Sequence, residues 1–217
     1  MQTVSILIAD DHAVVRRGLR ALLETQPHWR IVGEACNGRE AVEKAAALGP
    51  QVVILDIGMP KLNGLDAATL IYKANPKTRI LILTMHAAEE LIQQTLKAGA
   101  SGYVLKSDAE RDLLTAVDAL LHNKMFFTAV ASAVVLEHLR EGHKKKDVFA
   151  ERERLSVRER EVVQLLAEGK SNKEIGASLN ISKRTVDHHR ARIMDKLQIQ
   201  SVGELVLYAV RNKIVEA

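Results

Sequence analysis

The stretch VVIL at residues 52–55 decides the fold, because it is apolar without alternation and is followed at once by Asp56. A strand with this pattern is buried on both faces, as the central strands of a parallel sheet are. Similar apolar or β-branched runs occur at 4–9, 30–36, 79–84 and 102–105, with amphipathic stretches of helical spacing between them. This alternation predicts a doubly wound α/β fold, with a five-stranded parallel sheet and helices on both of its faces.

The composition is that of an ordinary globular protein. Of the 217 residues, 47% are hydrophobic and 27% are charged, which excludes a disordered tail and a collagen. The single cysteine, Cys36, excludes an internal disulfide and a thiolate metal cluster, and it is typical of a reducing cytoplasm. The longest apolar stretch, at 125–136, is too short to cross a bilayer, and the run at 4–9 meets two aspartates too early for a signal peptide. We therefore expect a cytoplasmic protein without a membrane partner.

The chain divides in charge as well as in pattern. Residues 1–122 carry 13 lysines and arginines against 14 acidic residues, whereas residues 123–217 carry 18 against 13. The strand signals stop near residue 123, a helical pattern covers 128–142, and the charged run at 142–147 indicates a linker. We predict an α/β domain at 1–122, a helical and charged linker at 123–150, and a small all-α domain at 151–217. The basic excess of the last part favours a polyanion as its partner.

Five polar residues stand at the ends of the predicted strands, and a parallel sheet brings these ends to one edge. Asp10 and Asp11 follow the first strand, Asp56 follows the third, and Thr84 and Lys106 come at the ends of the fourth and fifth. Each residue alone has an ordinary structural explanation, such as a helix cap or a turn for an aspartate. Their convergence on one rim favours a functional site.

Charge limits the chemistry of this rim. Two carboxylates about 4 Å apart repel by about 4 kcal/mol at an effective dielectric constant near 20. A divalent cation would offset that repulsion; oxygen ligands favour Mg²⁺, and zinc is disfavoured because the pattern places no histidine or cysteine nearby. A carboxylate beside Mg²⁺, with Lys106 and Thr84 as donors, is suited to accept a phosphoryl group.

These residues lie in four motifs: IADDH at 8–12, LDIGMPKLNG at 55–64, TMHA at 84–87 and GASGYVLK at 99–106. Together the motifs resemble a two-component receiver domain, over residues 3–122. The resemblance implies a flavodoxin-like fold, with Asp56 as the phospho-acceptor and a histidine kinase as the donor. It also implies metal ligation by Asp10 (through water), Asp11, Asp56 and the carbonyl of Gly58, phosphoryl contacts from Thr84 and Lys106, and a switch aromatic, Tyr103, that turns inward when Thr84 moves.

Four short helical patterns follow the predicted linker, at 157–168, 172–179, 183–197 and 202–212. A serine precedes each one in the N-cap position; these are Ser156, Ser171, Ser182 and Ser201. The second and third patterns share an apolar face across a short turn around Asn180. The opposite face of the third is basic, with Lys183, Arg184, His188, Arg190 and Arg192. Such a helix fits the major groove of DNA, and a solvated amphipathic helix is the alternative.

The segment LSVREREVVQLLAEGKSNKEIGASLNISKRTVDHHRARIMDKLQIQS at 155–201 closely resembles a LuxR-type helix-turn-helix. With the receiver, the chain resembles a NarL/FixJ-family response regulator. This resemblance implies that Asn172 and Lys173 contact the DNA backbone, that Thr185 and His189 belong to the core of the motif, and that His188 faces the groove. Asp187 departs from the lysine that is frequent at its position, so it either faces a cytosine amino group or lies off the groove.

We therefore predict a transcription regulator, not an enzyme, in which phosphorylation of Asp56 controls promoter binding. The helical pattern at 202–212 is predicted to supply the dimer contact on DNA through Val202, Leu205, Val206 and Ala209, although some of these residues must pack on the core of their own domain. A purely intramolecular helix is the alternative. A two-fold dimer would read half-sites about 10 bp apart. RNA polymerase is a further expected partner.

Two other functions fit parts of the pattern. An aspartyl-nucleophile phosphatase also uses carboxylates and Mg²⁺ on an α/β sheet, but its nucleophile follows the first strand in a D-x-D pattern, where this chain has the adjacent pair Asp10-Asp11. A DNA-binding protein with a vestigial receiver is the second alternative, and the presence of all five site residues disfavours it.

Overall fold

The computed structural model describes residues 3–85, 88–128, 131–132 and 155–215. The chain forms two compact units, Met1–Gly142 and His143–Ala217, and each has its own buried core. Within the described ranges, the helices lack the length and hydropathy that a membrane crossing requires.

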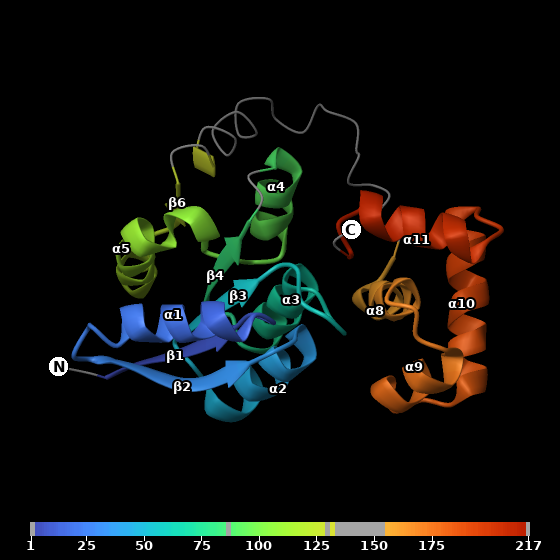
Figure 1. Cartoon of the computed structure of the whole chain (residues 1–217), viewed down its shortest axis with the longest axis horizontal. Helices are drawn as coiled ribbons and strands as arrows, with labels where there is room; N and C mark the ends of the chain where they lie inside the picture. Colours follow the sequence, from blue (N-terminus) through green and yellow to red (C-terminus); the bar gives the residue numbers. More distant parts are fainter. Residues whose placement is uncertain (1–2, 86–87, 129–130, 133–154, 216–217) are drawn as a thin grey trace. The chain divides into compact units, whose positions relative to one another are not determined.

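The first unit is built on a parallel sheet with the strand order β2-β1-β3-β4-β5-β6 (Figure 1). Its strands are β1 (Val4–Ala9), β2 (Trp29–Ala35), β3 (Val52–Asp56), β4 (Arg79–Thr84), β5 (Gly102–Leu105) and β6 (Phe126–Phe127). Every residue of β3 is buried, as its unbroken apolar pattern predicts. The predicted parallel α/β fold is confirmed.

Helices cover both faces of this sheet. Helices α1 (Ala13–Leu23) and α5 (Ala109–Leu121) pack on one face, over a core that includes Ile6 and Ile8 of β1. On the other face, Leu7 and Ala9 point into a second core with α2 (Gly38–Leu48), α3 (Gly64–Ala74) and α4 (Glu89–Lys97). A short 3₁₀ turn, η1 (Lys106–Asp108), joins β5 to α5. The helices thus leave the edge at the carboxyl ends of the strands to the loops that carry the predicted site.

The sheet has one strand more than the five predicted. Phe126 and Phe127 pair with Gly102 and Tyr103 of β5, in a stretch where the sequence pattern predicts that strands have ended. Two residues are too short to show periodicity. Gly102 gives this pairing room, because a Cβ there would lie 2.8 Å from Leu81 Cδ1 and 3.1 Å from the carbonyl oxygen of Phe126. The predicted helix at 128–142 and charged run at 142–147 lie largely outside the described residues, and the linker boundaries stay a prediction.

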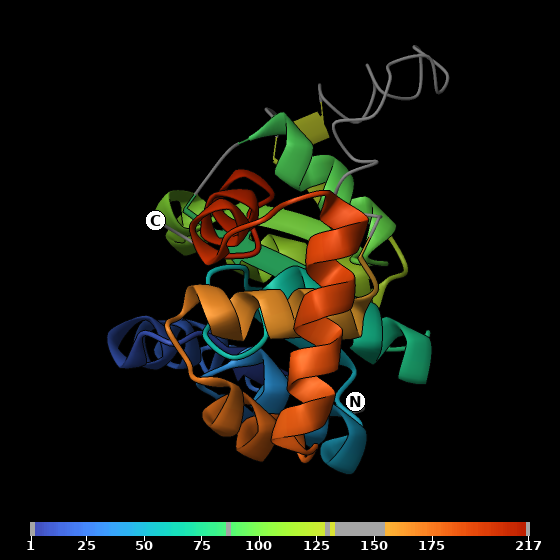
Figure 2. The same cartoon turned by 90° about the vertical axis from the view of Figure 1, so that its right-hand side faces the viewer.

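The second unit is helical throughout residues 157–211 apart from short turns. Its helices are α8 (Val157–Ala167), α9 (Asn172–Leu179), α10 (Lys183–Leu197) and α11 (Val202–Arg211). Each predicted N-cap serine accepts a hydrogen bond from the backbone amide three residues later, so the prediction of these four helix starts is confirmed. In Figure 2, α10 crosses α8 and meets α9 at its N-terminal end.

A glycine at the start of α3 fixes the loop after β3. A Cβ on Gly64 would lie 1.9 Å from the carbonyl oxygen of Asp56, which is backbone and cannot move aside cheaply. We expect Gly64→Ala to lower the free energy of unfolding by about 3 kcal/mol, the upper end of the usual cost of overpacking. Gly18→Ala, on an exposed turn of α1 with nothing within 4 Å, should instead raise it by about 0.5–1 kcal/mol.

Urea unfolding followed by the fluorescence of Trp29, the single tryptophan, measures both variants in the unit that contains them. A Gly64→Ala variant as stable as wild type would contradict this account of the loop.

Candidate functional sites

An acidic cluster lies at the carboxyl ends of β1 and β3. The two strands pair in parallel with Ala9 opposite Leu55, so Asp10 and Asp56, the next residues, are neighbours. Ligand atoms of Asp10, Asp11, His12 and Asp56 all lie within 4.8 Å of one another. The structure thus brings together the three carboxylates that the sequence places at the ends of two strands.

Lys106 is the counter-charge inside this cluster. Its Nζ lies 2.8 Å from Asp10 Oδ2 and 2.8 Å from Asp56 Oδ2. Asp10 is fully buried and Asp56 is 5% exposed, so both ion pairs lie out of bulk water. Burial alone would lower the pKa of Lys106, but the hydrogen bonds and attraction from Asp10 and Asp56 outweigh it and raise that pKa. Lys106 therefore stays charged.

His12 joins the cluster, contrary to the prediction that no histidine lies near the aspartates. Its Nδ1 is 2.7 Å from Asp11 Oδ1 and 3.3 Å from Asp10 Oδ1. His12 occupies the N-cap position of α1, where an extended backbone turns its side chain back towards the acidic loop. The position of His12 directly after Asp11 in the sequence could have predicted that it joins the cluster. The imidazole is 67% exposed, whereas the rest of the donor set is carboxylate oxygen.

The donor set fits a hard divalent cation. Three carboxylates face one ammonium, so the cluster keeps an excess of negative charge, and oxygen is the ligand atom that Mg²⁺ prefers. Gly58, the predicted carbonyl ligand, lies in the loop that follows β3, and that loop is closed by the amide of Gly64 donating to the carbonyl of Ile57.

Thr84 lies on β4, the strand next to that of Asp56, and Tyr103 lies on β5, one strand further along the sheet. Thr84 is the last residue of β4 and is 1% exposed, one position beyond the residue that pairs with Asp56. Tyr103 is also 1% exposed and belongs to the core, so its ring already points inward in this structure, where the expectation was an inward turn linked to movement of Thr84. Burial raises the pKa of Tyr103 to about 12.

In the second unit, a tight turn joins α9 to α10. Asn180 has a φ of 53°, and the amide of Ile181 donates to the carbonyl of Gly176. A side chain at Gly176 would crowd this turn, since its Cβ would lie 2.7 Å from the carbonyl oxygen of Ile181. Val186 and Ile193 of α10 are buried against the other helices. The arrangement is a helix-turn-helix.

The outer face of α10 carries the predicted DNA contacts. Lys183, Arg184, Thr185, Asp187, His188, Ala191 and Arg192 are exposed, and His189 and Arg190 are half-buried. On α9, Lys173 is exposed and Asn172 is half-buried. The amide of Asn172 donates to a carboxylate oxygen of Asp187, so the two helices are tied at the base of this face. That contact gives Asp187 a partner that the sequence did not indicate.

A hollow beside α10 is lined by a further basic residue, Lys170, that the sequence interpretation did not include among the DNA contacts. It opens between the end of α8 and the starts of α9 and α10, and Lys170, Lys183 and Arg190 line it together with Asn172. Lys170 stands directly before the N-cap serine of α9, and that position was the available signal. The hollow concentrates positive charge at the edge of the proposed DNA-binding face.

The predicted dimer contact on α11 divides between the core and the surface. For Leu205 and Ala209 the prediction is wrong, because both are fully buried in the core of their own unit. Val202, 38% exposed, and the half-buried Val206 remain at the surface. Leu207, 56% exposed, is an apolar surface residue that the spacing did not single out.

Comparison with known proteins gives the same two parts. Residues 6–118 match the response regulator receiver domain, and residues 153–209 match the luxR family of bacterial regulatory proteins. The chain is 37% identical over 217 residues to the oxygen regulatory protein NreC of Staphylococcus epidermidis, across 98% of this chain and 100% of NreC.

Solved structures of RcsB are also similar to this chain. The RcsB response regulator of Salmonella typhimurium has a TM-score of 0.57 at 31% identity, over 95% of this chain and 98% of RcsB. A structure of two RcsB dimers bound to two parallel DNAs has a TM-score of 0.59 at 29% identity, over 97% of this chain and 99% of the other.

The Lys106 ion pairs generate a prediction about stability. Lys106→Ala leaves two buried carboxylates without their ammonium, and we expect it to lower the free energy of unfolding by about 3–5 kcal/mol in the absence of divalent cations. Mg²⁺ should restore part of the loss by binding the same carboxylates, and so should the second change Asp10→Asn.

The measurement is urea unfolding with EDTA and with Mg²⁺, with Lys77→Ala as a control that removes the same charge from an exposed position. If Lys106→Ala were as stable as wild type in EDTA, Lys106 would not be what holds the carboxylates together.

Proposed function

Because the chain belongs to the response regulators that join a receiver domain to a LuxR-type DNA-binding domain, we propose that transfer of a phosphoryl group to Asp56 controls promoter binding by the second unit. The chain is a two-component response regulator and not an enzyme. The observation that carries the proposal is the contact of Asp56 with Lys106 at 2.8 Å, inside a cluster of three carboxylates. A histidine kinase is the proposed donor, and the cytoplasm the proposed compartment.

Asp56 is the carboxylate best placed to react. Asp10 and Asp56 both face Lys106, but Asp10 is fully buried and its Oδ1 also accepts from the amide of His12. Asp11 is paired with His12 at the exposed side. In the transfer, an oxygen of Asp56 attacks the phosphorus of a phosphohistidine; the P–O bond forms as the P–N bond breaks, and the imidazole keeps the electron pair and takes up a proton.

The other residues of the cluster support this transfer. Asp10, Asp11, Asp56 and the Gly58 carbonyl would hold Mg²⁺, which supplies positive charge beside the phosphoryl oxygens when bound. The Lys106 ammonium would pair with the phosphoryl oxygens in place of the Asp56 carboxylate, and Thr84 would donate a hydrogen bond to the phosphoryl group. Tyr103 would respond to the movement of Thr84.

We propose that α10 enters the major groove of promoter DNA. Lys173, Lys183 and Arg192 would contact phosphates, and His188 would contact base edges. Asp187 carries a negative charge among these cations, and its contact with Asn172 holds it at the side of the helix that faces α9. Val202 and Val206 of α11 are the proposed dimer contact because they stay at the surface of that helix. The structure of two RcsB dimers bound to DNA supports a DNA-bound dimer.

The proposed switch is tested by operator affinity. With a small phosphodonor and Mg²⁺, the wild-type chain should bind its promoter fragment about 5- to 150-fold more tightly, the range of a typical coupling free energy of 1–3 kcal/mol. Asp56→Asn should abolish the gain without changing the affinity that remains. Lys106→Ala should still be labelled but should show a smaller gain.

The promoter fragment is the one that the wild type enriches most from genomic DNA, and affinities are compared at one salt concentration. Equal gains in wild type and Asp56→Asn would place the switch somewhere other than Asp56.

Salt dependence separates the residues that contact phosphates from those that read bases. Lys173→Ala should weaken binding to all DNA sequences alike and make the slope of log affinity against log salt shallower by about 0.9. His188→Ala should change the preferred sequence instead. Lys77→Ala, which removes a charge from the other unit, is the control and should change neither. A Lys173→Ala variant with altered preference and unchanged affinity would contradict these roles.

A further inference from the structure

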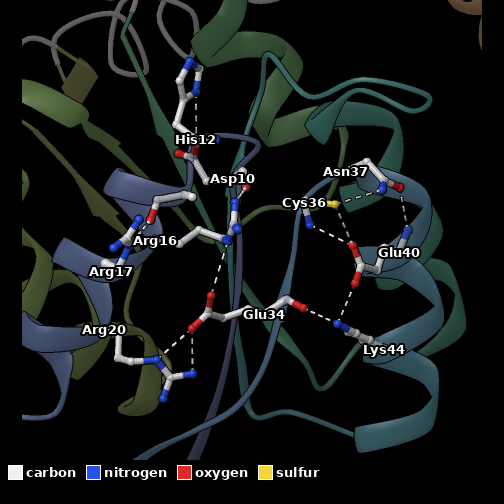
Figure 3. A network of polar contacts seen from close by, with 11 residues as sticks. Asp10, His12, Arg16, Arg17, Arg20, Glu34, Cys36, Asn37, Glu40 and Lys44 are labelled. Carbon is white, nitrogen blue, oxygen red and sulfur yellow. Dashed lines mark hydrogen bonds and ion pairs between the residues drawn. The ribbon is translucent and has the colours of Figure 1, made fainter.

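Arg16 links the acidic cluster to β2, the edge strand of the sheet, through two nitrogens of its guanidinium (Figure 3). Its Nη1 donates to the backbone carbonyl of Asp10 at 2.7 Å, and its Nε donates to Glu34 Oε2 at 3.3 Å. The Arg16 side chain is 17% exposed and starts from α1. Asp10 directly follows β1, and Glu34 is the next-to-last residue of β2. A single guanidinium thus bridges three separate elements.

The carbonyl that Arg16 binds belongs to the peptide that links Asp10 to Asp11. The amide of Asp10 is already held by the carbonyl of Ala35 at 3.2 Å, and its carboxylate by the amide of His12 at 2.8 Å. Arg16 fixes the remaining polar group of Asp10. Since the peptide is planar, the direction of its carbonyl sets the position of the Asp11 Cα, from which the Asp11 side chain starts. The side chain of Asp11 forms an ion pair with the exposed His12, so the backbone is its firmer support.

Glu34 holds Arg16 in place. Glu34 pairs with Ile8 in the register of β1 and β2, and its Oε1 lies 2.6 Å from Arg20 Nη2. The hydrogen bond from Arg20 is the main reason that the pKa of Glu34 is lowered, so Glu34 stays ionised beside Arg16. Lys44 of α2 also donates to the backbone carbonyl of Glu34. The acceptor that orients Arg16 is therefore itself fixed from three sides.

We propose that Arg16 is a positioning residue for the Asp10–Asp11 pair and thereby sets the affinity of the cluster for Mg²⁺. The inference rests on the proposed metal site. Groups that orient metal ligands without touching the metal typically contribute 10- to 100-fold to metal affinity. Arg16 has the geometry of such a group, because it binds the backbone carbonyl of Asp10 and not the carboxylates of Asp10 and Asp11, which would hold the metal.

The chain offers a matched control for this role. Arg20 is one turn further along α1, carries the same charge and binds the same Glu34. Among the described residues its guanidinium contacts Glu34 and Glu24, whereas that of Arg16 reaches the carbonyl of Asp10. Arg16→Gln and Arg20→Gln therefore remove the same charge and each breaks one ion pair to Glu34. They differ in the hydrogen bond to the Asp10 carbonyl, which only Arg16→Gln removes, and in the exposed pair with Glu24, which only Arg20→Gln removes.

The experiment is calorimetric titration of the full chain with Mg²⁺. We expect Arg16→Gln to bind Mg²⁺ 10- to 100-fold more weakly than wild type, Arg16→Lys to lie between the two, and Arg20→Gln to stay within about 3-fold. With a small phosphodonor, the Mg²⁺ concentration for half-maximal labelling of Asp56 should rise by the same factor in Arg16→Gln. The maximal rate at saturating Mg²⁺ should change little, because the reacting oxygen belongs to another strand.

Urea unfolding followed by Trp29 fluorescence identifies folded variants, and Arg16→Lys serves if Arg16→Gln is unfolded. Equal Mg²⁺ affinity in wild type and the Arg16 variants would overturn the inference, and so would equal weakening by Arg16→Gln and Arg20→Gln. Asp11→Asn should bind Mg²⁺ much more weakly. If wild type itself bound no Mg²⁺, or if Asp11→Asn bound as tightly as wild type, the proposed metal site would fail as a whole.

Discussion

Repulsion between three carboxylates is the constraint around which the first unit is organised. Asp10 follows the last residue of β1 and Asp56 ends β3, so the pairing of the two strands forces them together. At about 4 Å and an effective dielectric constant near 20, one such pair costs about 4 kcal/mol, a large part of the net stability of a typical domain. Lys106 offsets part of this cost, and burial in the two cores provides the rest. A cluster held together in this way is stabilised by any cation that enters it.

The sheet explains which parts of this site could be predicted from the sequence. Asp10, Asp56 and Lys106 stand at the ends of strands, and a parallel sheet puts all such ends on one edge whatever the details of packing. His12 and Arg16 were not predicted as parts of the site because they belong to α1 and not to a strand end: His12 is the N-cap residue and Arg16 lies in the first turn. Their directions depend on how that helix starts, and no strand periodicity reports on it.

Periodicity also could not predict which surface covers the apolar face of α11, the core of its own unit or a second copy of the chain. The spacing of Leu205 and Ala209 identifies one face of α11 but does not say whether a second copy or the same unit covers it. The structure places both in the core with Ile214, and the exposed Leu207 lies off that stripe. Charge was the more reliable signal in this unit: solvation keeps most of the basic residues of α10 at the surface, because burying an unpaired ammonium or guanidinium is costly.

The strand that was not predicted lies next to the residue with the proposed switch role. Tyr103 pairs with Phe127 of β6, and β6 immediately precedes the segment that leads to the second unit. Thr84, on the other side of β5, pairs with Leu105, so β5 lies between the strand that carries Thr84 and the strand from which the chain leaves the sheet. Backbone hydrogen bonds across three adjacent strands therefore join the edge where Asp56 lies to the start of the connection. Movement of Thr84 and Tyr103 would therefore act on backbone that is hydrogen-bonded to β6, the last strand before the chain leaves the sheet.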